Sequence, residues 1–549
     1  MKLSNLKSSR MIAALIAAVA VLTITVAIPA SAQTFNTLYD FNYTDGLNPS
    51  GQMVQASNGI LYGTTGGDLI NSDGTIFEIT AGGALSTITY FGGTVGEVPY
   101  AGLIQATNGD LYGTTYDGGT NGDGTVFEIT PSGTLTTLHE FDGTDGSEAV
   151  GRLVQSTNGD FYGTTQIGGA NSYGTVFGMT AGGALTTLHS FTAGTDGANP
   201  YGGVVQGTDG NFYGTTQHGG AYGYGVVYKM TPSGTLTTLY SFQYNDPNGG
   251  NPRGELVQGS NGDFYGTTYS FGVNESGTIY KITTSGTLSL VYTFCSQTSC
   301  TDGGLPWAGL IQGSDGNFYG TTYGGGINGG NGTIFKVTPS GTFTNLYSFT
   351  GSAGGSFPEG TLVQATNGTF YGTTVSGGTG RTGTVFSLST GLGRFVSLVS
   401  TSGKEGAKIG ILGQGFSSSS VVKFDGVQAT TVARTGSTFL SATVPAGALT
   451  GAVTVTTGST TLTSSNTFRV TPTITSFSPP SGPVETLVTI NGTGLTQATE
   501  VAFNGKLAAF TVVSDIEITA TVPTGATTGK VGVATKGGSA ASATSFAVN

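Results

Sequence analysis

Charged side chains are scarce in this 549-residue chain: Asp, Glu, Lys and Arg together make up only 9% of it. Cations are the scarcer kind, with 18 Lys and Arg against 30 Asp and Glu. Nucleic acids and anionic membranes are bound through clusters of Lys and Arg, which an acidic chain with few cations does not supply. The composition therefore argues against a nucleic-acid partner, and solubility must come from Thr, Ser, Asn and exposed turns.

Histidine and cysteine, which serve as metal ligands and nucleophiles, are also rare. The chain has three histidines, His139, His189 and His218, and two cysteines, Cys295 and Cys300. Two thiolates with no His nearby make a poor metal site, so in an exported protein the default prediction is a disulfide. The sequence contains repeats, described below, and His139 and His189 occupy a position that is Tyr in other copies. No nucleophile elbow, P-loop or zinc motif occurs. We expect no catalytic residues, no metal and no cofactor.

Only one apolar run is long enough to concern a membrane. Three basic residues precede an apolar run over residues 11–28, and small residues follow at positions 30–32. This pattern predicts an export signal cleaved before Gln33; the alternative is an uncleaved anchor, because the run is long for a signal. Removing residues 1–32 takes away three cations and leaves 15 Lys and Arg against 30 Asp and Glu. We expect an extracellular or cell-surface protein, with the periplasm as the alternative, and no membrane span after cleavage.

Glycine is abundant, with 96 copies, and much of it belongs to a repeat. The tetrapeptide Tyr-Gly-Thr-Thr starts at Tyr62, Tyr112, Tyr162, Tyr213, Tyr265, Tyr319 and Tyr371. Intervals of 50 to 54 residues mark an array of one supersecondary unit. Aromatic residues at a fixed period argue against the disorder that the glycine content alone could suggest. Residues present in every copy are most simply explained as scaffold, so function is expected where the copies differ.

Each repeat has the pattern of four short strands. In the fourth copy they cover residues 204–206, 211–216, 225–231 and 236–242. In all seven copies Asn-Gly or Asp-Gly separates the first strand from the second, which predicts a hairpin with a type I′ turn. Four antiparallel strands in about 50 residues are typical of a β-propeller blade.

The number of strands predicts a closed ring. The first three strands occur seven times, whereas the fourth follows them only six times; its seventh copy, residues 35–41, precedes the first complete repeat. That copy would complete the last blade, 360–389, and leave no exposed edge. An open solenoid is the alternative, but it should carry capping repeats. We predict an all-β fold: a seven-bladed β-propeller over residues 33–390, closed by its N-terminal strand.

The repeat resembles a tandem-repeat family of exported bacterial proteins, GloVer, over residues 35–389. The resemblance is carried by Leu-Val-Gln, Asn/Asp-Gly-x-Phe-Tyr-Gly-Thr-Thr, Gly-Thr-Val-Phe-x-Ile-Thr and Leu-Thr-Thr-Leu-Tyr-x-Phe. It implies no known activity.

A second tandem pair follows, over residues 394–471 and 472–549. Gly413-Gln-Gly415-Phe416 recurs as Gly492-Thr-Gly494-Leu495, and the whole pattern is offset by 78–79 residues. Alternating Val and Thr divided by Gly and Pro fit small β-sandwiches. Both members resemble the IPT/TIG immunoglobulin-like family, which implies spacers or adhesion modules rather than catalytic domains.

Two polar positions recur in the repeats, and we assign both to structure. Seven glutamines, from Gln55 to Gln364, follow the apolar pair of each first strand. We expect them to satisfy buried backbone groups between blades, a ring that binds a polar ligand being the alternative. Asp-Gly recurs in the loop that follows the fourth strand, as at Asp45 and Asp302. Single carboxylates spread around a ring do not converge on one calcium ion, so turn initiation is the expected role.

Loop length predicts where a ligand would bind. The loops between the second and third strands, and between the fourth strand and the next repeat, are long and variable, and both lie at one end of a propeller, here named the long-loop face. Aromatic rings among neutral polar residues suit stacking on sugars; packing within their own loops is the alternative. The region around Arg253, Cys295–Cys300 and Trp307 breaks the repeat pattern most. The candidate ligand-binding residues are Tyr116, Tyr173, Tyr222, Tyr224, Tyr244, Arg253, Tyr269, Trp307 and Tyr323.

The favoured function is a non-catalytic, monomeric surface-binding or adhesion protein that recognises a polysaccharide or a cell-surface partner. One alternative is a polysaccharide-active hydrolase or lyase, which would need paired carboxylates; irregularly placed candidates are Glu148, Glu255, Glu275 and Glu359. The other alternative is a purely structural surface protein.

Overall fold

The computed structural model describes residues 33–67 and 73–549. Nearly all regular structure in these ranges is β; the helices among them are two short 3-10 turns, η1 (Gly93–Val95) and η2 (Thr298–Cys300). No helix in the described ranges is long and apolar enough to cross a membrane. The predicted export signal, residues 1–32, lies outside them. The all-β prediction is confirmed.

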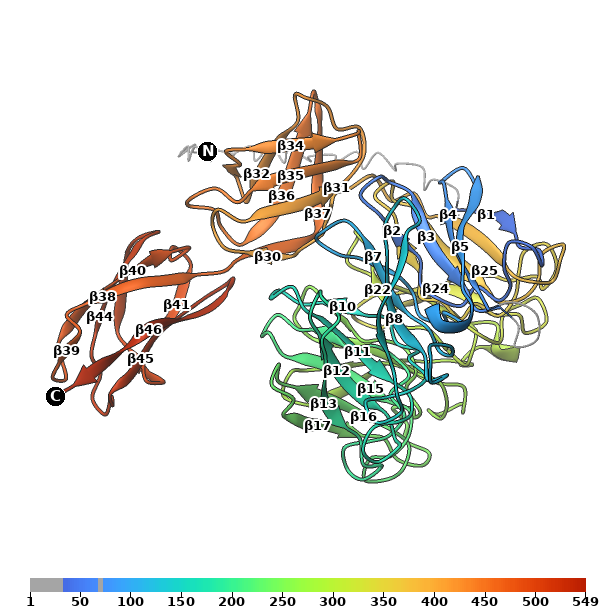
Figure 1. Ribbon diagram of the computed structural model, residues 1–549, viewed down its shortest axis with the longest axis horizontal. Helices are drawn as coiled ribbons and strands as arrows, with labels where there is room; N and C mark the ends of the chain where they lie inside the picture. Colours follow the sequence, from blue (N-terminus) through green and yellow to red (C-terminus); the bar gives the residue numbers. More distant parts are fainter. Residues whose placement is uncertain (1–32, 68–72) are drawn as a thin grey trace, which may run out of the picture.

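Residues 54–348 form six antiparallel sheets of four strands, each built from consecutive strands in chain order (Figure 1). The first strand of each sheet has only two residues, the second has four or five, the third five and the fourth six. The strands are β2 (Val54–Gln55), β3 (Leu61–Thr65), β4 (Thr75–Ile79), β5 (Leu85–Tyr90); β6 (Ile104–Gln105), β7 (Leu111–Thr114), β8 (Thr125–Ile129), β9 (Leu135–Glu140); β10 (Val154–Gln155), β11 (Phe161–Thr165), β12 (Thr175–Met179), β13 (Leu185–Ser190); β14 (Val205–Gln206), β15 (Phe212–Thr216), β16 (Val226–Met230), β17 (Leu236–Ser241); β18 (Val257–Gln258), β19 (Phe264–Thr268), β20 (Thr278–Ile282), β21 (Leu288–Thr293); β22 (Ile311–Gln312), β23 (Phe318–Thr322), β24 (Thr333–Val337) and β25 (Phe343–Ser348).

A seventh four-stranded sheet joins the two ends of the repeat region. Its strands are β26 (Val363–Gln364), β27 (Phe370–Thr374), β28 (Thr384–Ser389) and the N-terminal β1 (Thr34–Asp40), in the order β1-β28-β27-β26. β1 pairs antiparallel with β28, so it holds the place that the fourth strand has in the other six sheets.

The turn between the first and second strands forms a hairpin, but not of the predicted type. In the first repeat the N–H of Gly59 donates to the carbonyl of Ala56 at 2.8 Å. Gly59 has φ 84°, whereas Asn58 is not among the positive-φ residues. A type I′ turn needs positive φ at both central positions, so the predicted turn type was wrong. A single left-handed Gly that follows the turn is typical of the three-residue hairpin loop. The Asn58 side chain accepts from the N–H of Ile60 at 3.0 Å, which fixes the turn.

The Tyr-Gly-Thr-Thr motif is scaffold, as predicted. The Tyr162 ring stacks on Phe212 of the next sheet with centroids 4.0 Å apart. A Cβ on Gly63 would lie 2.5 Å from Cζ of Phe77 in the same sheet, so the third strand's ring requires glycine there. Buried threonine hydroxyls pair across the second and third strands, as at Thr165 and Thr175, 2.8 Å apart. The tyrosine, the glycine and the second threonine of the motif therefore all serve packing between strands or sheets.

Neighbouring sheets are joined by shared cores and by the recurring glutamines. Seven core clusters each contain residues of two neighbouring sheets, and one of them joins the seventh sheet to the first. Each glutamine side chain accepts from a backbone N–H of an adjacent repeat, as Gln105 does from Ser57 at 2.8 Å. Gln55 accepts from the N–H of Thr366, again between the first and last repeats. The structural role that was predicted for the glutamines is confirmed.

The recurring Asp residues are held by the side chains of the fourth strands. Tyr240 donates its hydroxyl to Asp246 at 2.6 Å, and His139 Nε2 lies 2.7 Å from Asp145. Histidine thus takes the place of tyrosine, as predicted. No group of three or more His, Cys, Asp or Glu side chains that could hold a metal occurs in the described part of the chain.

The rest of the chain forms two units, each made of two sheets around one core. Both have the same topology: a sheet of order β29-β31-β35-β34 with one of order β30-β37-β36-β32-β33, and β38-β40-β44-β43 with β39-β46-β45-β41-β42. The strands of the first unit are β29 (Ser397–Leu398), β30 (Ser402–Gly403), β31 (Lys408–Leu412), β32 (Val421–Phe424), β33 (Val427–Gln428), β34 (Val432–Thr435), β35 (Phe439–Thr443), β36 (Gly451–Thr457) and β37 (Thr460–Val470). Those of the second are β38 (Thr473–Ser478), β39 (Ser481–Gly482), β40 (Leu487–Thr493), β41 (Ala498–Phe503), β42 (Lys506–Ala508), β43 (Phe510–Ser514), β44 (Glu517–Thr521), β45 (Gly529–Thr535) and β46 (Gly538–Val548).

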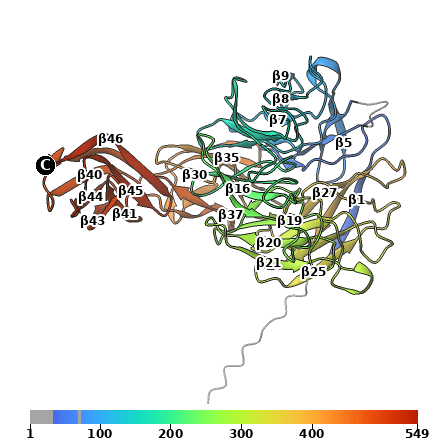
Figure 2. The same cartoon turned by 90° about the horizontal axis from the view of Figure 1, so that it is seen from below.

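The first unit contacts the repeat region, whereas the second projects away from it (Figures 1 and 2). The contacts fall on the short turns between first and second strands, at the end opposite the long-loop face. They are hydrogen bonds from Thr438 Oγ1 to Ser57 O at 2.9 Å, from Arg469 Nη1 to Thr208 O at 2.7 Å, and from Phe395 N to Thr366 O at 3.1 Å.

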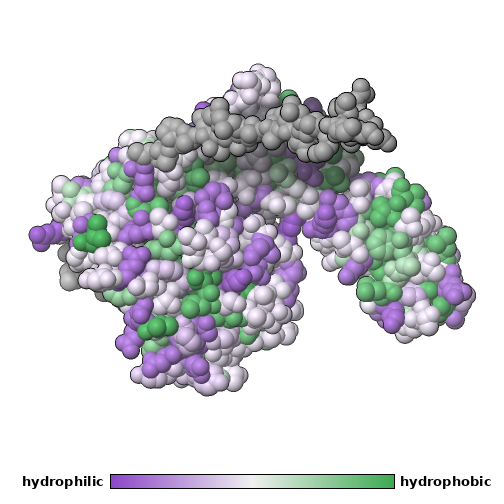
Figure 3. Space-filling model, turned by 180° about the vertical axis from the view of Figure 1, so that it is seen from behind, coloured by the Kyte–Doolittle hydropathy of each residue, from purple (hydrophilic) through white to green (hydrophobic). Residues whose placement is uncertain are grey.

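The second unit carries apolar side chains on its surface, which gather on the face seen in Figure 3. Its exposed large apolar residues are Val484, Leu487, Leu507, Val513 and Ile516.

Candidate functional site

One pocket collects residues from all seven repeats. Each repeat contributes the residue that lies four positions before its first strand, and this position holds a different type of side chain in almost every copy. The seven residues are Ser50, Tyr100, Val150, Tyr201, Arg253, Trp307 and Glu359. The next residue is Gly or Ala in every copy, because a side chain there meets the neighbouring repeat; a Cβ on Gly254 would lie 2.5 Å from the N of Gly309. Small residues thus bring the repeats together, and the variable ones line the pocket.

Arg253 is surrounded by aromatic rings. Its guanidinium carbon lies 3.9 Å from the centroid of Trp307, 4.3 Å from that of Tyr269 and 5.6 Å from that of Tyr201. With the Gln217 amide oriented so that its oxygen faces Arg253, Nη2 and Nε donate to it at 2.9 and 3.0 Å. Nη1 is buried and has no hydrogen-bond partner in the described structure. The cation is fixed by stacking and one amide, with donor capacity left over.

Glu359 is a largely, but not fully, buried carboxyl group in the same pocket. Burial raises its pKa to about 7, against the opposing effect of the Arg253 charge. Burial also raises the pKa of Tyr100, Tyr201 and Tyr323, and the Glu359 carboxylate adds to this effect for all three. Glu359 thus lies among tyrosine rings, and near neutral pH it can either donate or accept a hydrogen bond.

The pocket has a floor made by an ion pair that crosses it. Arg152 Nε lies 3.5 Å from Glu255 Oε2, and the N–H of Arg152 donates to Glu255 Oε1 at 3.1 Å. The pair passes over Gly203 of the intervening repeat, where a Cβ would lie 2.9 Å from Glu255 Oε1. Gln52 and Thr361 also line this level. Arg152 and Glu255 also line a second cavity, of about 270 Å³, so the ion pair lies between the two.

Several of the sequence-predicted binding residues meet at this pocket. Arg253 and Trp307 line it, and Tyr269 contacts both of them. Tyr323 lies 5.6 Å from Trp307, centroid to centroid, and Tyr116 lies 5.5 Å from Tyr100.

The other predicted aromatic residues lie elsewhere. Tyr224, Tyr244 and Phe271 pack against one another at centroid distances of 5.0 to 5.8 Å, and Tyr244 remains 65% exposed. Tyr173 and Tyr222 are exposed by 42% and 59%. None of these four tyrosines lines the pocket.

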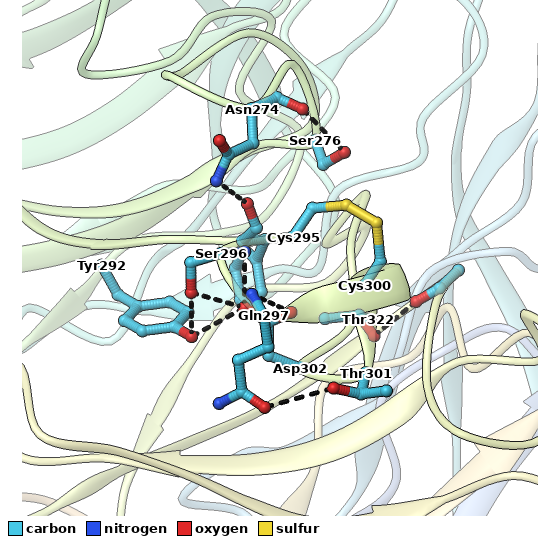
Figure 4. Close-up of a disulfide and its surroundings, with 12 residues drawn as sticks. Asn274, Ser276, Tyr292, Cys295, Ser296, Gln297, Cys300, Thr301, Asp302 and Thr322 are labelled. Atoms are coloured by element: carbon cyan, nitrogen blue, oxygen red, sulfur yellow. Dashed lines mark hydrogen bonds between the residues drawn. A yellow bond between two sulfur atoms is a disulfide. The ribbon is translucent and has the colours of Figure 1, made fainter.

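The disulfide forms as predicted, but the two cysteines are not among the residues that line the pocket. Figure 4 shows its loop, in which Asp302 accepts from the hydroxyl of Tyr292 at 2.7 Å and from the N–H of Ser296 at 2.9 Å. The sequence analysis thus identified Arg253 and Trp307, which line the pocket, but grouped them with the Cys295–Cys300 loop, which does not.

Several residues of the pocket were missing from the sequence-predicted set or were assigned elsewhere. Tyr100, Tyr201 and Arg152 were not selected, and Glu255 and Glu359 were noted only as possible catalytic carboxylates. For Tyr100, Tyr201 and Glu359 a signal was available: the position four residues before each first strand varies in the repeats, between positions that do not. Arg152 lies outside that position, two residues before β10. His218 lies near Arg253; burial, and then the charge of Arg253, lower its pKa, so it is neutral at physiological pH.

The repeats match a family model described as the Gloeobacter/Verrucomicrobia repeat, over residues 22–206, 172–300 and 291–415. These matches cover well over half of the chain. The chain belongs to the Gloeobacter/Verrucomicrobia repeat family. In this family member the second C-terminal unit matches the IPT/TIG domain model over residues 472–548. The first unit has no such match, so two IPT/TIG domains are more than the comparison supports.

No curated protein matches the chain. Several solved structures resemble it distantly. A putative gluconolactonase is 14% identical, with 66% of this chain and 94% of that chain covered and a TM-score of 0.35. A putative 6-phosphogluconolactonase from Bacteroides uniformis is 17% identical, covering 54% and 84%, with a TM-score of 0.37. SGBP-B from a xyloglucan utilization locus in Bacteroides uniformis is 20% identical, covering 28% and 48%, with a TM-score of 0.15. At these TM-scores the similarities give no information about function.

Proposed function

We propose that this protein is an exported, non-catalytic binding protein that holds a glycan in the pocket between its seven repeats. The single observation that carries the proposal is the set of side chains in that pocket: Trp307, Tyr100 and Tyr201 beside Arg253 and Glu359. Aromatic rings stack on the C–H faces of sugars, and a carboxyl group with a guanidinium bonds their hydroxyls.

The architecture that we propose around the pocket is a seven-bladed β-propeller over residues 33–390. The pairing of β1 with β28 and the glutamine bond between Gln55 and Thr366 support closure of the ring. Residues 394–471 and 472–549 would then be two Ig-like spacers. The matching topology of the two units supports an IPT/TIG assignment for the first one as well.

Export and a surface location belong to the same proposal. A disulfide persists in an oxidising compartment, and an IPT/TIG domain suits a surface or binding role. An acidic chain of low charge suits an uncharged or weakly charged partner rather than nucleic acid. We expect the exported chain to be monomeric.

A glycan array tests the proposal. We expect the protein to bind at least one class of oligosaccharide, and Trp307→Ala to weaken that binding by about tenfold or more through loss of stacking. Tyr244→Ala is the matched control, because Tyr244 is an aromatic residue of a long loop that does not line the pocket. Equal loss in the two variants would place binding outside the pocket, and an array without any bound glycan would favour the structural alternative.

A polysaccharide-active enzyme is the second candidate, and one observation favours it. Glu255 and Glu359 line the same pocket, and the pKa of Glu359, raised to about 7, suits a general acid. Against this role, Glu255 is already paired with Arg152. Release of reducing ends or unsaturated products from a polysaccharide panel, lost in Glu359→Gln, would establish catalysis.

A further inference from the structure

The shape of the pocket bears on which part of a glycan it can hold, an inference that rests on the proposed function. All seven repeats contribute residues to its wall, so the wall encircles a ligand. A groove that holds an internal segment of a polysaccharide must be open at two ends. This pocket opens only where the long loops lie, unless a passage leads through its floor.

The floor is occupied by side chains. Arg152 and Glu255, whose side chains lie 3.5 Å apart, line both this pocket and the cavity on its other side. Gln52 lines both as well and donates its side-chain N–H to Leu362 O at 3.0 Å. Glu255 is also packed against the backbone of its neighbours, with Gly203 and Gly309 close enough that neither could carry a Cβ. Opening the floor would break an ion pair and leave two charges unpaired.

Beyond the floor, the first C-terminal unit covers the other end of the channel. Four cavities of about 270 to 440 Å³ lie there. Three of them are lined by the first strands of the repeats or the turns after them, together with residues in the range 397–401 of the first C-terminal unit. The fourth lies beneath the floor and is lined by first-strand residues and Asn466. Arg469 and Thr438 anchor the unit by hydrogen bonds to the carbonyls of Thr208 and Ser57. A sugar chain passing down the channel would meet this unit.

The volume of the pocket sets the length of the part that it holds. Its volume is about 80 Å³, and a single water needs about 10–15 Å³ on the same measure. The pocket therefore has room for roughly five to eight waters, which is the size of one sugar ring and not of two.

We infer that the protein recognises the terminal unit of a glycan chain, and not an internal segment. Glu359, which lines the pocket beside Arg253 and can donate or accept a hydrogen bond, would bond the hydroxyls that only a chain end leaves free. Trp307 and Tyr100 would pack against the faces of that unit. The remaining units of the chain would extend outward over the long loops and contribute little.

The test uses the full-length protein and chemically defined oligosaccharides. A glycan array with mono- to hexasaccharides of glucose, galactose, mannose, xylose and glucuronic acid first identifies a bound sugar. The hexasaccharide of that sugar is then titrated by calorimetry in three forms: free, blocked at the non-reducing terminal unit (a 4,6-O-benzylidene acetal for a hexose, O-methylation for xylose or glucuronic acid), and reduced to the alditol at the other end.

We expect one of the two blocks to weaken binding at least a hundredfold, and the affinity of unblocked chains to change less than about threefold from two to six units. Comparable binding of all three forms, or an affinity that rises more than tenfold over that range, would overturn terminal recognition while leaving glycan binding intact. Absence of binding to every array sugar by a folded protein would overturn the proposed function itself, and terminal recognition with it. Trp307→Ala, inside the pocket, should abolish the effect of the block. Tyr173→Ala, outside the pocket, should preserve it.

Discussion

The guanidinium carbon of Arg253 lies 3.9 Å from the centroid of the Trp307 ring, although the two residues belong to consecutive repeats. Each lies four residues before a two-residue strand, β18 or β22. The short strands bring both side chains to the same pocket, and the rings of Tyr201 and Tyr269 complete the surroundings of the cation. The contact explains how a scaffold of near-identical repeats produces one site without symmetry.

Replacing Arg253 tests whether this contact orders the pocket. Arg253→Lys keeps the positive charge but loses the planar stacking and the two bonds to Gln217, since the two side chains are not interchangeable at a stacked site. We expect a loss of about 1–2 kcal/mol in the free energy of unfolding, measured by urea denaturation. Arg381→Lys, at an arginine that does not line the pocket, is the control. Equal stability of Arg253→Lys and the wild type would show that the stacking is not stabilising.

The stability of the protein should depend on the protonation of Glu359. Burial raises the pKa of this carboxyl from 4.5 to about 7, so folding favours the protonated form. The stabilisation is complete below pH 4.5 and is lost as the pH rises through 7. A shift of this size corresponds to roughly 3 kcal/mol.

The measurement compares wild type with Glu359→Gln by urea denaturation at pH 4.5 and pH 8. We expect the variant to gain stability relative to the wild type at the higher pH by about 2–3 kcal/mol. Glu405, whose pKa is also raised to about 7, is present in both proteins and cancels from the difference. A difference that does not change with pH would contradict a raised pKa.

The glutamines should stabilise the junctions between sheets. Gln105 accepts from Ser57 N and donates to Gly109 O, each at 2.8 Å. Gln105→Ala removes both partners, and we expect it to cost about 1–3 kcal/mol of unfolding free energy. Gln428→Ala, at an exposed glutamine of the first C-terminal unit, should have no measurable effect. Thermal or urea denaturation gives the comparison, and equal effects would remove the special role of the repeat position.

Loss of the disulfide should affect stability and leave binding unchanged. Cys295 and Cys300 close a loop of only five residues' separation, so replacing both by Ser should cost about 2 kcal/mol in the chain-entropy model. Neither residue lines the pocket, so the affinity for a bound glycan should stay within twofold or so. A large loss of affinity in a variant that is still folded would place the loop in the site.

Chelators should not change the melting temperature. Carboxylates such as Asp246 and Asp302 are used by tyrosine hydroxyls and backbone N–H groups, and in the described residues no cluster of metal-ligand side chains occurs. Calcium would need several oxygen ligands on one ion. Calorimetric scans with EDTA and with added Ca²⁺ should coincide; a rise in melting temperature with Ca²⁺ that EDTA reverses would reveal a site.

Most of the scaffold could be predicted from the sequence, because local patterns decide it. The period of Tyr-Gly-Thr-Thr, the Asn-Gly pairs and the β-branched runs each report strands and turns within a few residues of one another. The roles of the glutamines and of His139 also followed from the repeat, since a position shared by every copy serves the same contact. The turn type was wrong because the dipeptide predicts a two-residue loop, whereas the carbonyl of Ala56 accepts from Gly59 in a longer one.

The candidate site was predictable only in part. Its aromatic residues and Arg253 could be found as departures from the repeat, but Tyr173, Tyr222 and Tyr244 departed from it equally. Which of them share a pocket depends on where each side chain lies relative to the first strands, and contacts between distant repeats decide that. By itself the sequence determined the unit and its number, because these follow from spacing along the chain. Only the tertiary structure decided that Glu359 lies near Arg253 and Tyr100, because burial and charge neighbours arise when repeats that are far apart in the sequence come together.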